Sequence, residues 1–106
     1  MFGVVPKPLW ERRVSADERN RIQLGMRCLL VEHDDGLVLV DTGLGNKEGA
    51  KFHDIYGIEN AGGGGRTWLE SSLASLGFGV DDVRWVVNTH LHFDHCGGNH
   101  LFAGKL

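Results

Sequence analysis

Apolar and polar residues alternate along residues 22–32, and this alternation predicts an amphipathic β-strand. The apolar residues of one face are Ile22, Leu24, Met26, Cys28 and Leu30. An Asp-Gly pair within residues 33–36 predicts a tight hairpin turn after this strand. Residues 37–40 are all apolar and form the expected return strand, and such an unbroken run indicates burial on both faces of a sheet.

A helical pattern follows farther along the chain. Thr67 is a suitable N-cap, Glu70 completes a capping box three residues later, and Gly77 is a natural stop. The apolar stripe of this helix consists of Trp68, Leu69, Leu73 and Leu76. Residues 83–87 then predict a buried strand, so the expected order is a hairpin, helices and a further strand.

The remaining segments are less regular. Two prolines interrupt the apolar residues 1–10, and we expect an ordered loop or irregular edge there rather than a strand. Residues 17–20 predict a polar turn, and residues 48–56 a short helix. The glycine run at residues 62–65 is either a mobile loop at the rim of a site or a linker.

Length and charge narrow the function classes. The 106 residues suffice for one small domain, and 42% hydrophobic with 24% charged residues is typical of a globular protein. The net charge of −3 and the lack of a basic run argue against nucleic acid as a partner. We expect no membrane partner and a cytoplasmic location, because the sequence shows neither a spanning apolar run nor a leader pattern. Cys28 and Cys96 are too few for a disulfide framework.

Candidate chemistry lies directly after the predicted strand 83–87. His90, His92, Asp94 and His95 provide three imidazoles and a carboxylate, which are ligand types that zinc prefers. Two histidines at i and i+2 converge on one ion only where the chain is extended, since in a helix they point apart. A second ion can take Asp94 and His95, and we expect Gly97 and Gly98 to let the backbone pass closely and begin a helix. Metal-activated water at such a site would hydrolyse an ester, lactone, amide or thioester.

Each candidate residue also has a simpler interpretation. The loop 90–95 is alternatively a histidine-rich surface loop. Asp41, which ends the strand 37–40, either supports a ligand histidine or only forms a turn. Ordinary structural or solvated roles are expected for the other residues of metal-ligand type: His33, His53, His100, Cys28 and Cys96.

These motifs together resemble the metallo-β-lactamase superfamily. The resemblance rests on the pattern His-x-His-x-Asp-His-x-Gly-Gly at residues 90–98 and on Leu-Val-Asp-Thr-Gly at residues 39–43. It implies an α/β fold, namely the N-terminal half of an αβ/βα sandwich with a mostly antiparallel or mixed sheet and flanking helices. It also implies two zinc ions, with His90 and His92 on the first, Asp94 and His95 on the second, and Asp41 in a supporting role.

Residues 2–10 and 88–99 resemble, more narrowly, the quorum-quenching N-acyl-homoserine-lactonase branch. In that branch a metal-bound hydroxide attacks the lactone carbonyl, and the carboxylate equivalent to Asp94 passes a proton to the leaving oxygen. The expected partner is therefore a small lactone or other acyl compound. Other substrates of the same fold are a β-lactam, a thioester or a phosphodiester, and a non-catalytic metal-binding fragment that needs a second chain is the alternative from another class.

The sequence departs from the family pattern after His95. Family members carry a further histidine, a bridging carboxylate and a last histidine downstream, whereas this chain ends at Leu106. We therefore expect a partial domain over residues 1–106, with little activity of its own and weak metal binding. Half of a sandwich also leaves one sheet face uncovered, so we expect self-association through the exposed sheet.

Overall fold

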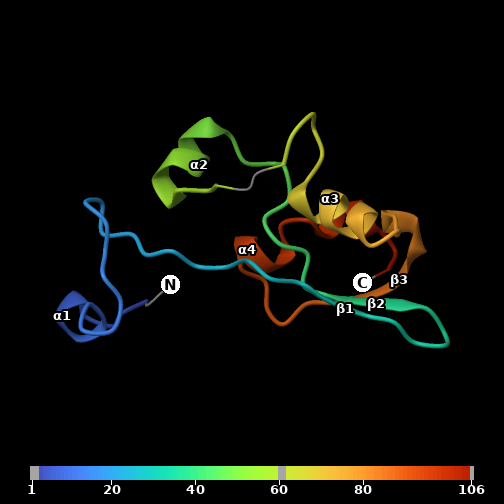
Figure 1. Ribbon diagram of the computed structural model, residues 1–106, viewed down its shortest axis with the longest axis horizontal. Coiled ribbons are helices and arrows are strands. Elements are labelled where there is room, and N and C mark those ends of the chain that lie inside the picture. Colours follow the sequence, from blue (N-terminus) through green and yellow to red (C-terminus); the bar gives the residue numbers. More distant parts are fainter. Residues whose placement is uncertain (1–2, 60–61, 106) are drawn as a thin grey trace.

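The computed structural model describes residues 3–59 and 62–105 (Figure 1). Its elements in chain order are α1 (Lys7–Trp10), β1 (Leu29–Val31), β2 (Leu37–Val40), α2 (Ala50–Tyr56), α3 (Trp68–Ser75), the 3-10 helix η1 (Val80–Asp82), β3 (Val83–Val87), α4 (Phe93–Cys96) and the 3-10 helix η2 (Asn99–Phe102). In the described part of the chain, no helix is long and apolar enough to span a bilayer.

The three strands form one mixed sheet in the order β1-β2-β3. β1 is antiparallel to β2 through the predicted hairpin, in which the Gly36 amide donates to the His33 carbonyl at 2.9 Å. β2 is parallel to β3, because the chain between them crosses over through α2 and α3. The expected α/β architecture with a mixed sheet and flanking helices is therefore confirmed.

The first predicted strand is much shorter than its sequence pattern. Only Leu29–Val31 pairs with β2, whereas the prediction covered residues 22–32. β2 ends at Val40 because Asp41 adopts a left-handed conformation with φ of 62° and turns the chain out of the sheet. Residues 22–28 are therefore left without a partner strand, and the apolar alternation alone does not make a strand.

The helix α3 begins with the predicted capping box. The Thr67 hydroxyl accepts from the Glu70 amide at 3.1 Å, and a Glu70 carboxylate oxygen accepts from the Thr67 amide at 2.7 Å. The stripe prediction was only partly right, because Leu73 is buried and Leu69 half-buried, whereas Trp68 and Leu76 are exposed. The helix therefore packs against the core through Leu73 and Leu69.

Replacing Thr67 by alanine is expected to lower the free energy of unfolding by about 1–2 kcal/mol. The exchange removes the buried hydroxyl that accepts from the Glu70 amide and donates to the Glu70 carboxylate. Urea unfolding of this variant measures the loss. Ser72→Ala within the same helix is the matched control, and we expect it to change stability by less than about 0.5 kcal/mol. Equal stability of the two variants would contradict a role for the cap.

The two shorter helices α1 and α2 lie away from the sheet and from α3 (Figure 1). α1 replaces the loop predicted at residues 1–10, because a proline in the first turn is compatible with a helix; Met1 and Phe2 lie outside the described residues. α2 matches the helix predicted at 48–56 but begins at Ala50. The Arg19 guanidinium lies 2.9 Å from Asp54 of α2, so the polar turn predicted at residues 17–20 is joined to this helix.

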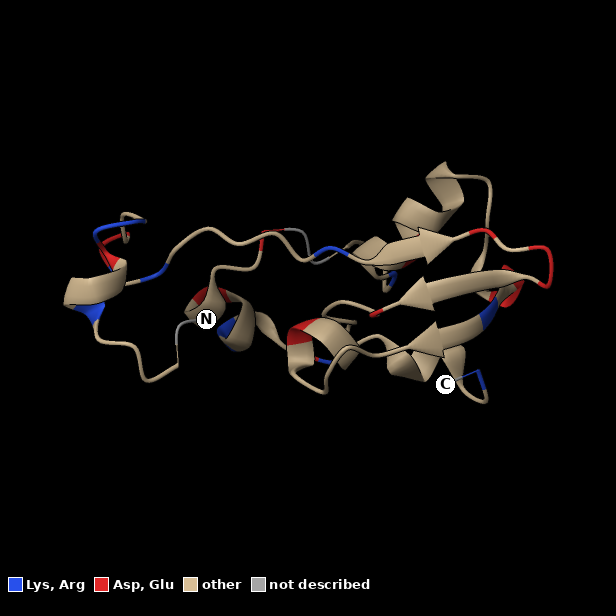
Figure 2. Cartoon of the chain, turned by 90° about the horizontal axis from the view of Figure 1, so that it is seen from below, with Lys and Arg blue, Asp and Glu red and all other residues tan. Residues whose placement is uncertain are grey.

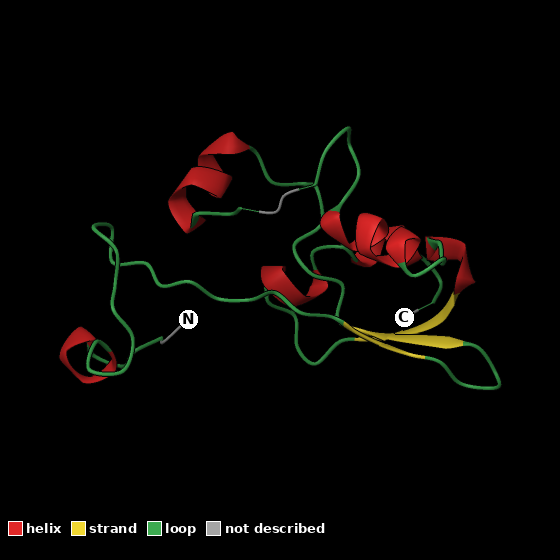
Figure 3. Cartoon of the chain, in the orientation of Figure 1, coloured by secondary structure: helices red, strands yellow, loops and turns green. Residues whose placement is uncertain are grey.

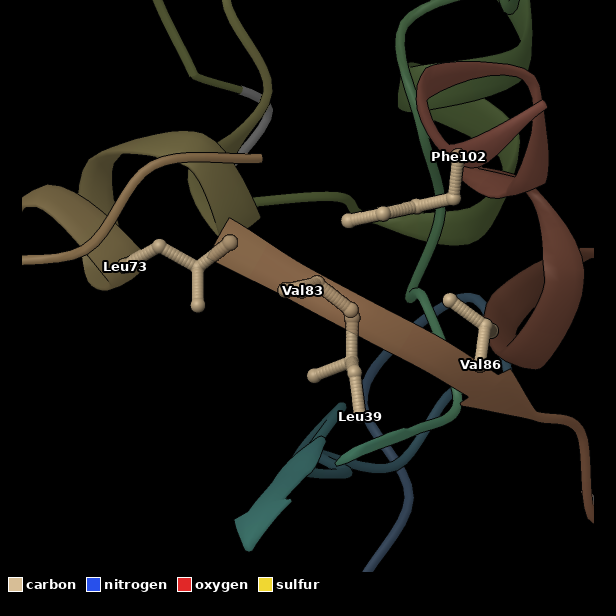
Figure 4. Close-up of a cluster of buried hydrophobic side chains, with 5 residues drawn as sticks. All are labelled: Leu39, Leu73, Val83, Val86 and Phe102. Carbon is tan, nitrogen blue, oxygen red and sulfur yellow. The ribbon is translucent and has the colours of Figure 1, made fainter. Parts of the chain in front are cut away.

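The core lies on one face of the sheet. Leu39 and Val86 from the strands meet Leu73 of α3 and Phe102 of η2, with Val83 at the start of β3 (Figure 4). The helices that lie over the sheet are all on this side (Figure 3). Along β2 only Leu37 and Leu39 are buried and the two valines are half-exposed, so the predicted burial on both faces was wrong.

The strand predicted at residues 83–87 is β3, with the predicted bounds. It too is buried on one face alone: Val83 and Val86 are buried, whereas Trp85 and Val87 are exposed. One face of the sheet is thus covered by helices, and the described residues leave its other face open, as expected for half of a sandwich.

Candidate metal centre

The histidine motif lies at the end of β3, where the chain leaves the sheet. His90 is in the loop after the strand, and His92 is the extended N-cap residue of α4, with φ of −74° and ψ of 151°. Asp94 and His95 are in the single turn of α4 itself. The structure thus has the predicted extended segment for the first two histidines, and the turn that follows carries the other two residues.

The four side chains lie close together. The ring centroids of His90 and His92 are 4.8 Å apart, and those of His90 and His95 are 3.9 Å apart. Nε2 of His95 lies 3.5 Å from a carboxylate oxygen of Asp94. The motif therefore gathers its imidazoles and its carboxylate at one edge of the sheet.

Asp41 extends this cluster from the neighbouring strand. Its Oδ2 lies 2.8 Å from Nδ1 of His95, and its Oδ1 accepts the backbone amide of Thr89 at 2.8 Å. The Thr89 hydroxyl also lies 2.8 Å from Oδ2. Burial by itself would raise the pKa of this carboxyl, but the hydrogen bonds from His95 and Thr89 outweigh burial, so the pKa of Asp41 lies below its usual value.

This contact fixes the protonation pattern of His95. An ionised carboxylate only accepts hydrogen bonds, so Nδ1 of His95 carries the proton that points at Asp41. Nε2, the second ring nitrogen, lies 3.5 Å from a carboxylate oxygen of Asp94 and is the ring atom that a metal ion could bind. Metal-binding histidines in proteins commonly have this arrangement, with one ring nitrogen held by a carboxylate and the other free to bind.

The two motifs are also joined through the backbone. The Thr42 amide donates to the His95 carbonyl at 2.7 Å, and Gly43 forms an isolated parallel bridge with Cys96. A Cβ atom on Gly97 would collide with the Leu44 carbonyl oxygen, so this approach requires glycine. Gly97 and Gly98 thus admit the loop that follows β2. Gly98 is the N-cap residue of η2, so the helix expected to begin here is a short 3-10 helix.

Some residues near the motif were missed by the sequence interpretation. The Asn99 amide group donates to the Asn88 side chain at 2.8 Å, and the Thr42 hydroxyl donates to the Asn99 side chain at 2.8 Å. Phe52 and Tyr56 of α2 contact the ring of Phe93 within the motif, with centroids 5.0 and 4.9 Å apart. Asn88 and Thr89 directly precede the motif, so their position in the sequence could have indicated a role. The aromatic residues of α2 are too far from the motif in sequence for such a prediction.

The other residues of ligand type lie elsewhere or serve packing. His33 is in the hairpin turn, at the opposite end of the sheet from the motif, and His53 is half-buried on α2, where we expected a solvated side chain. His100 is exposed on η2, with Nδ1 3.2 Å from the Gly97 carbonyl oxygen. Cys28 and Cys96 are half-buried free thiols, which agrees with the expectation of no disulfide.

The donor set is chemically suited to zinc, which takes imidazole nitrogen and carboxylate oxygen in four-coordinate sites. Across residues 3–59 and 62–105, however, no three His, Cys, Asp or Glu side chains are grouped so that they could hold an ion. The residues therefore fit a metal in donor type, and those described do not by themselves form a complete site. Additional ligands are needed to complete the coordination of each ion.

Comparison with known proteins shows which family has this combination of motifs. The sequence profile of the metallo-β-lactamase superfamily matches residues 25–106, a range that includes both motifs. The chain belongs to the metallo-β-lactamase superfamily. This assignment agrees with the mixed sheet, the flanking helices and the position of the motif at the sheet edge. The metal-ligand roles of His90, His92, Asp94 and His95, and the supporting role of Asp41, stay predictions.

Similar proteins within this superfamily include hydrolases. A probable metallo-hydrolase of Mycobacterium tuberculosis is 34% identical over 92% of this chain, and an N-acyl homoserine lactonase of Bacillus cereus is 29% identical over 79%. A crystal structure of a probable metal-dependent hydrolase from Staphylococcus aureus matches with a TM-score of 0.75 and 34% identity over 92% of this chain. This chain spans about a third of these relatives, at 34%, 36% and 34% of their lengths.

Proposed function

We propose that this protein is a zinc-dependent hydrolase that opens lactone rings of the acyl-homoserine-lactone type. The observation that carries the proposal is the pairing of Asp41 with His95 at 2.8 Å beside the rings of His90 and His92. Support for the substrate class comes from the similarity to the Bacillus cereus lactonase. Residues outside the shared third of the relatives' length would complete the site.

Each residue of the motif has a proposed role. His90 and His92 bind the first of two zinc ions, and Asp94 and His95 bind the second. Zinc bound there polarises a carbonyl group and makes water a stronger acid. Asp41 holds the proton of His95 on Nδ1 and thereby keeps Nε2 available as a ligand.

Asp94 is the proposed proton carrier. Its carboxylate is half-buried and lies 3.5 Å from Nε2 of His95, and this position beside a proposed ligand supports the assignment. When a lactone opens, the ring oxygen leaves as an alkoxide and needs a proton. We assign this transfer to Asp94, which would accept the proton lost by the attacking water and donate it to the leaving oxygen, because no other carboxylate belongs to residues 90–98.

The surroundings of Asp94 suit an acyl substrate. An open groove extends from Asp94 and Phe93 past Tyr56 and Leu44 to Trp68. Its apolar side chains can cover an aliphatic chain while the polar end of the substrate meets the metal motif.

The test combines metal binding and turnover. In zinc titrations against a competing chelator, His92→Ala is expected to weaken binding at least tenfold, because it removes a direct ligand. His100→Ala is the matched control, an exposed histidine outside the motif, and should bind zinc as the parent does. Turnover is measured on a chain extended to the length of the relatives, because residues 1–106 alone are expected to have little activity. This zinc-loaded protein is offered a lactone, a β-lactam and a thioester.

We expect the lactone to be opened fastest and His92→Ala to lose that turnover. Absence of zinc binding in excess metal would overturn the metal site. Zinc binding with preferred turnover of the β-lactam or the thioester would keep the site and overturn the substrate assignment.

A further inference from the structure

The turn that carries Asp94 and His95 is too short to hold its shape by itself. α4 consists of four residues, Phe93–Cys96, and a single helical turn makes few internal hydrogen bonds. Its carbonyl groups have no partners farther along the helix and need donors from elsewhere. Charged groups of the same segment do not supply them, because Asp94 is the only Lys, Arg, Asp or Glu residue within residues 88–99 (Figure 2). Support for the two candidate ligands therefore comes from uncharged groups or from other segments.

The ring and the carbonyl of His95 are held by separate contacts. Oδ2 of Asp41 lies 2.8 Å from the ring nitrogen Nδ1, and the amide of the next residue, Thr42, donates to the His95 carbonyl at 2.7 Å. The side-chain amide of Asn88 donates to the same carbonyl at 3.3 Å. These contacts together set the direction in which the imidazole leaves the turn.

Asn99 orients the donors that reach the His95 carbonyl. Its Nδ2 donates to Oδ1 of Asn88 at 2.8 Å, and Nδ2 of Asn88 donates back to Oδ1 of Asn99 at 3.2 Å. Oδ1 of Asn99 also accepts the Thr42 hydroxyl at 2.8 Å. Because one amide hydrogen of Asn88 is used in this reciprocal pair, its second hydrogen points to the His95 carbonyl.

Close approach of the backbone permits this network. Thr42 is 1% exposed, and Asn88 and Asn99 are half-buried. A Cβ atom on Gly98 would lie 2.4 Å from the Thr42 carbonyl oxygen, so glycine at this position brings Asn99 within reach of Thr42. Removal of one partner from hydrogen bonds shielded from water is costly, because the remaining groups are left unsatisfied.

We propose that Asn88 and Asn99 are positioning residues, which hold α4 and the two candidate ligands on it as one unit. Their hydrogen bonds reach the carbonyl of His95 in α4, whereas His90 and His92 precede the turn and are exposed. The inference rests on the proposed function in assigning the two ligands of α4 to one of two zinc ions. Loss of the asparagine pair should therefore weaken one ion site and leave the other unchanged.

Hydrogen exchange in the metal-free protein, extended to the length of the relatives, tests the positioning without any metal. The Asp41 amide donates to the Val87 carbonyl of β3 at 2.8 Å, whereas the adjacent Thr42 amide donates to α4. Asn99→Ala should speed exchange of the Thr42 amide about tenfold or more, because the turn is released. Exchange of the Asp41 amide should change less than about threefold, because the sheet still holds it.

Two further variants separate the network from general effects. Asn99→Asp keeps the size of the side chain but replaces the amide donor by an oxygen that faces Oδ1 of Asn88, so it should act as Asn99→Ala does. It also serves for the comparison if circular dichroism shows that Asn99→Ala does not fold. Asn46→Ala is the matched control, an exposed asparagine that donates to the Gly65 carbonyl at 2.8 Å, and it should leave both exchange rates unchanged.

Zinc titration of the extended chain against a competing chelator tests the link to the proposed metal site. The parent should bind two equivalents, and Asn99→Ala should weaken one of them about tenfold or more and the other less than about twofold. His92→Ala should weaken the other equivalent. In the double variant both equivalents should be weak, because the two changes act on different ions.

The possible outcomes separate this inference from the proposed function. Equal acceleration of the Asp41 and Thr42 amides in Asn99→Ala would overturn the inference, since it would show only a general loss of stability. Equal weakening of both zinc equivalents, or equal effects of Asn99→Ala and Asn46→Ala, would overturn it as well. If the parent binds no zinc, the proposed function fails, and selective release of the Thr42 amide still supports the positioning of the turn.

Discussion

Alanine in place of Gly97 is expected to destabilise the protein by about 3 kcal/mol, because its Cβ atom would collide with the Leu44 carbonyl oxygen. The φ of −60° and ψ of −30° at Gly97 are ordinary for alanine, so backbone strain does not contribute. The collision must instead separate the turn after α4 from the loop that follows β2. Urea unfolding measures the loss, and zinc titration should show weaker binding because the two motifs no longer pack together.

Gly63 offers a matched control for this substitution. It lies in an exposed turn where an added Cβ would meet no atom within 4 Å. Gly63→Ala should therefore change the free energy of unfolding by less than about 1 kcal/mol. If Gly97→Ala were as stable as Gly63→Ala, the close approach of the two motifs would be wrong.

Asparagine in place of Asp41 is expected to lower the free energy of unfolding by about 2 kcal/mol. Asparagine tolerates the left-handed conformation of this residue, so the exchange changes charge and hydrogen bonding rather than backbone shape. The carboxylate is only 6% exposed, and its loss leaves His95 and Thr89 without an ionised acceptor. Zinc affinity should fall about tenfold to a hundredfold, because His95 is no longer held with Nε2 free.

The same exchange should alter the acid sensitivity of the metal-free protein. The pKa of Asp41 is lower in the folded state than its ordinary value of 3.8. Its contribution to stability is therefore fully present above pH 3.8 and is lost as the pH falls through the lower native pKa. Urea unfolding between pH 2 and pH 7 should show a shallower acid decline for Asp41→Asn. Identical pH dependence in parent and variant would contradict an ionised, hydrogen-bonded Asp41.

Local signals predicted the elements that depend on neighbouring residues. The hairpin turn is formed by an Asp-Gly pair and its flanking strands, and the capping box of α3 by residues three apart, so both were visible in the sequence. The length of β1 was not visible in the sequence, because it depends on where β2 ends. The end of β2 is set by the left-handed conformation of Asp41. Burial on one face of the sheet also depends on which elements lie over it.

In the candidate site too, features formed by neighbouring residues could be predicted and contacts between distant residues could not. His90, His92, Asp94 and His95 could be proposed from spacing, since they lie in one short segment. The contact of Asp41 with His95 agrees with the supporting role that the resemblance implied. The packing of Phe52 and Tyr56 on Phe93 was not predictable, because nothing in the local pattern of α2 indicates which surface it meets.

The backbone bonds between the two motifs separate the shape of the histidine loop from its chemistry. Thr42 holds the His95 carbonyl and Gly43 pairs with Cys96 through main-chain atoms, so these contacts do not use the imidazole side chains of the loop. Exchange of an imidazole in the loop for a thiolate or a carboxylate would therefore alter metal preference without requiring a new backbone path. The proposed metal preference of such a loop could therefore be changed, by natural variation or by design, through its side chains alone.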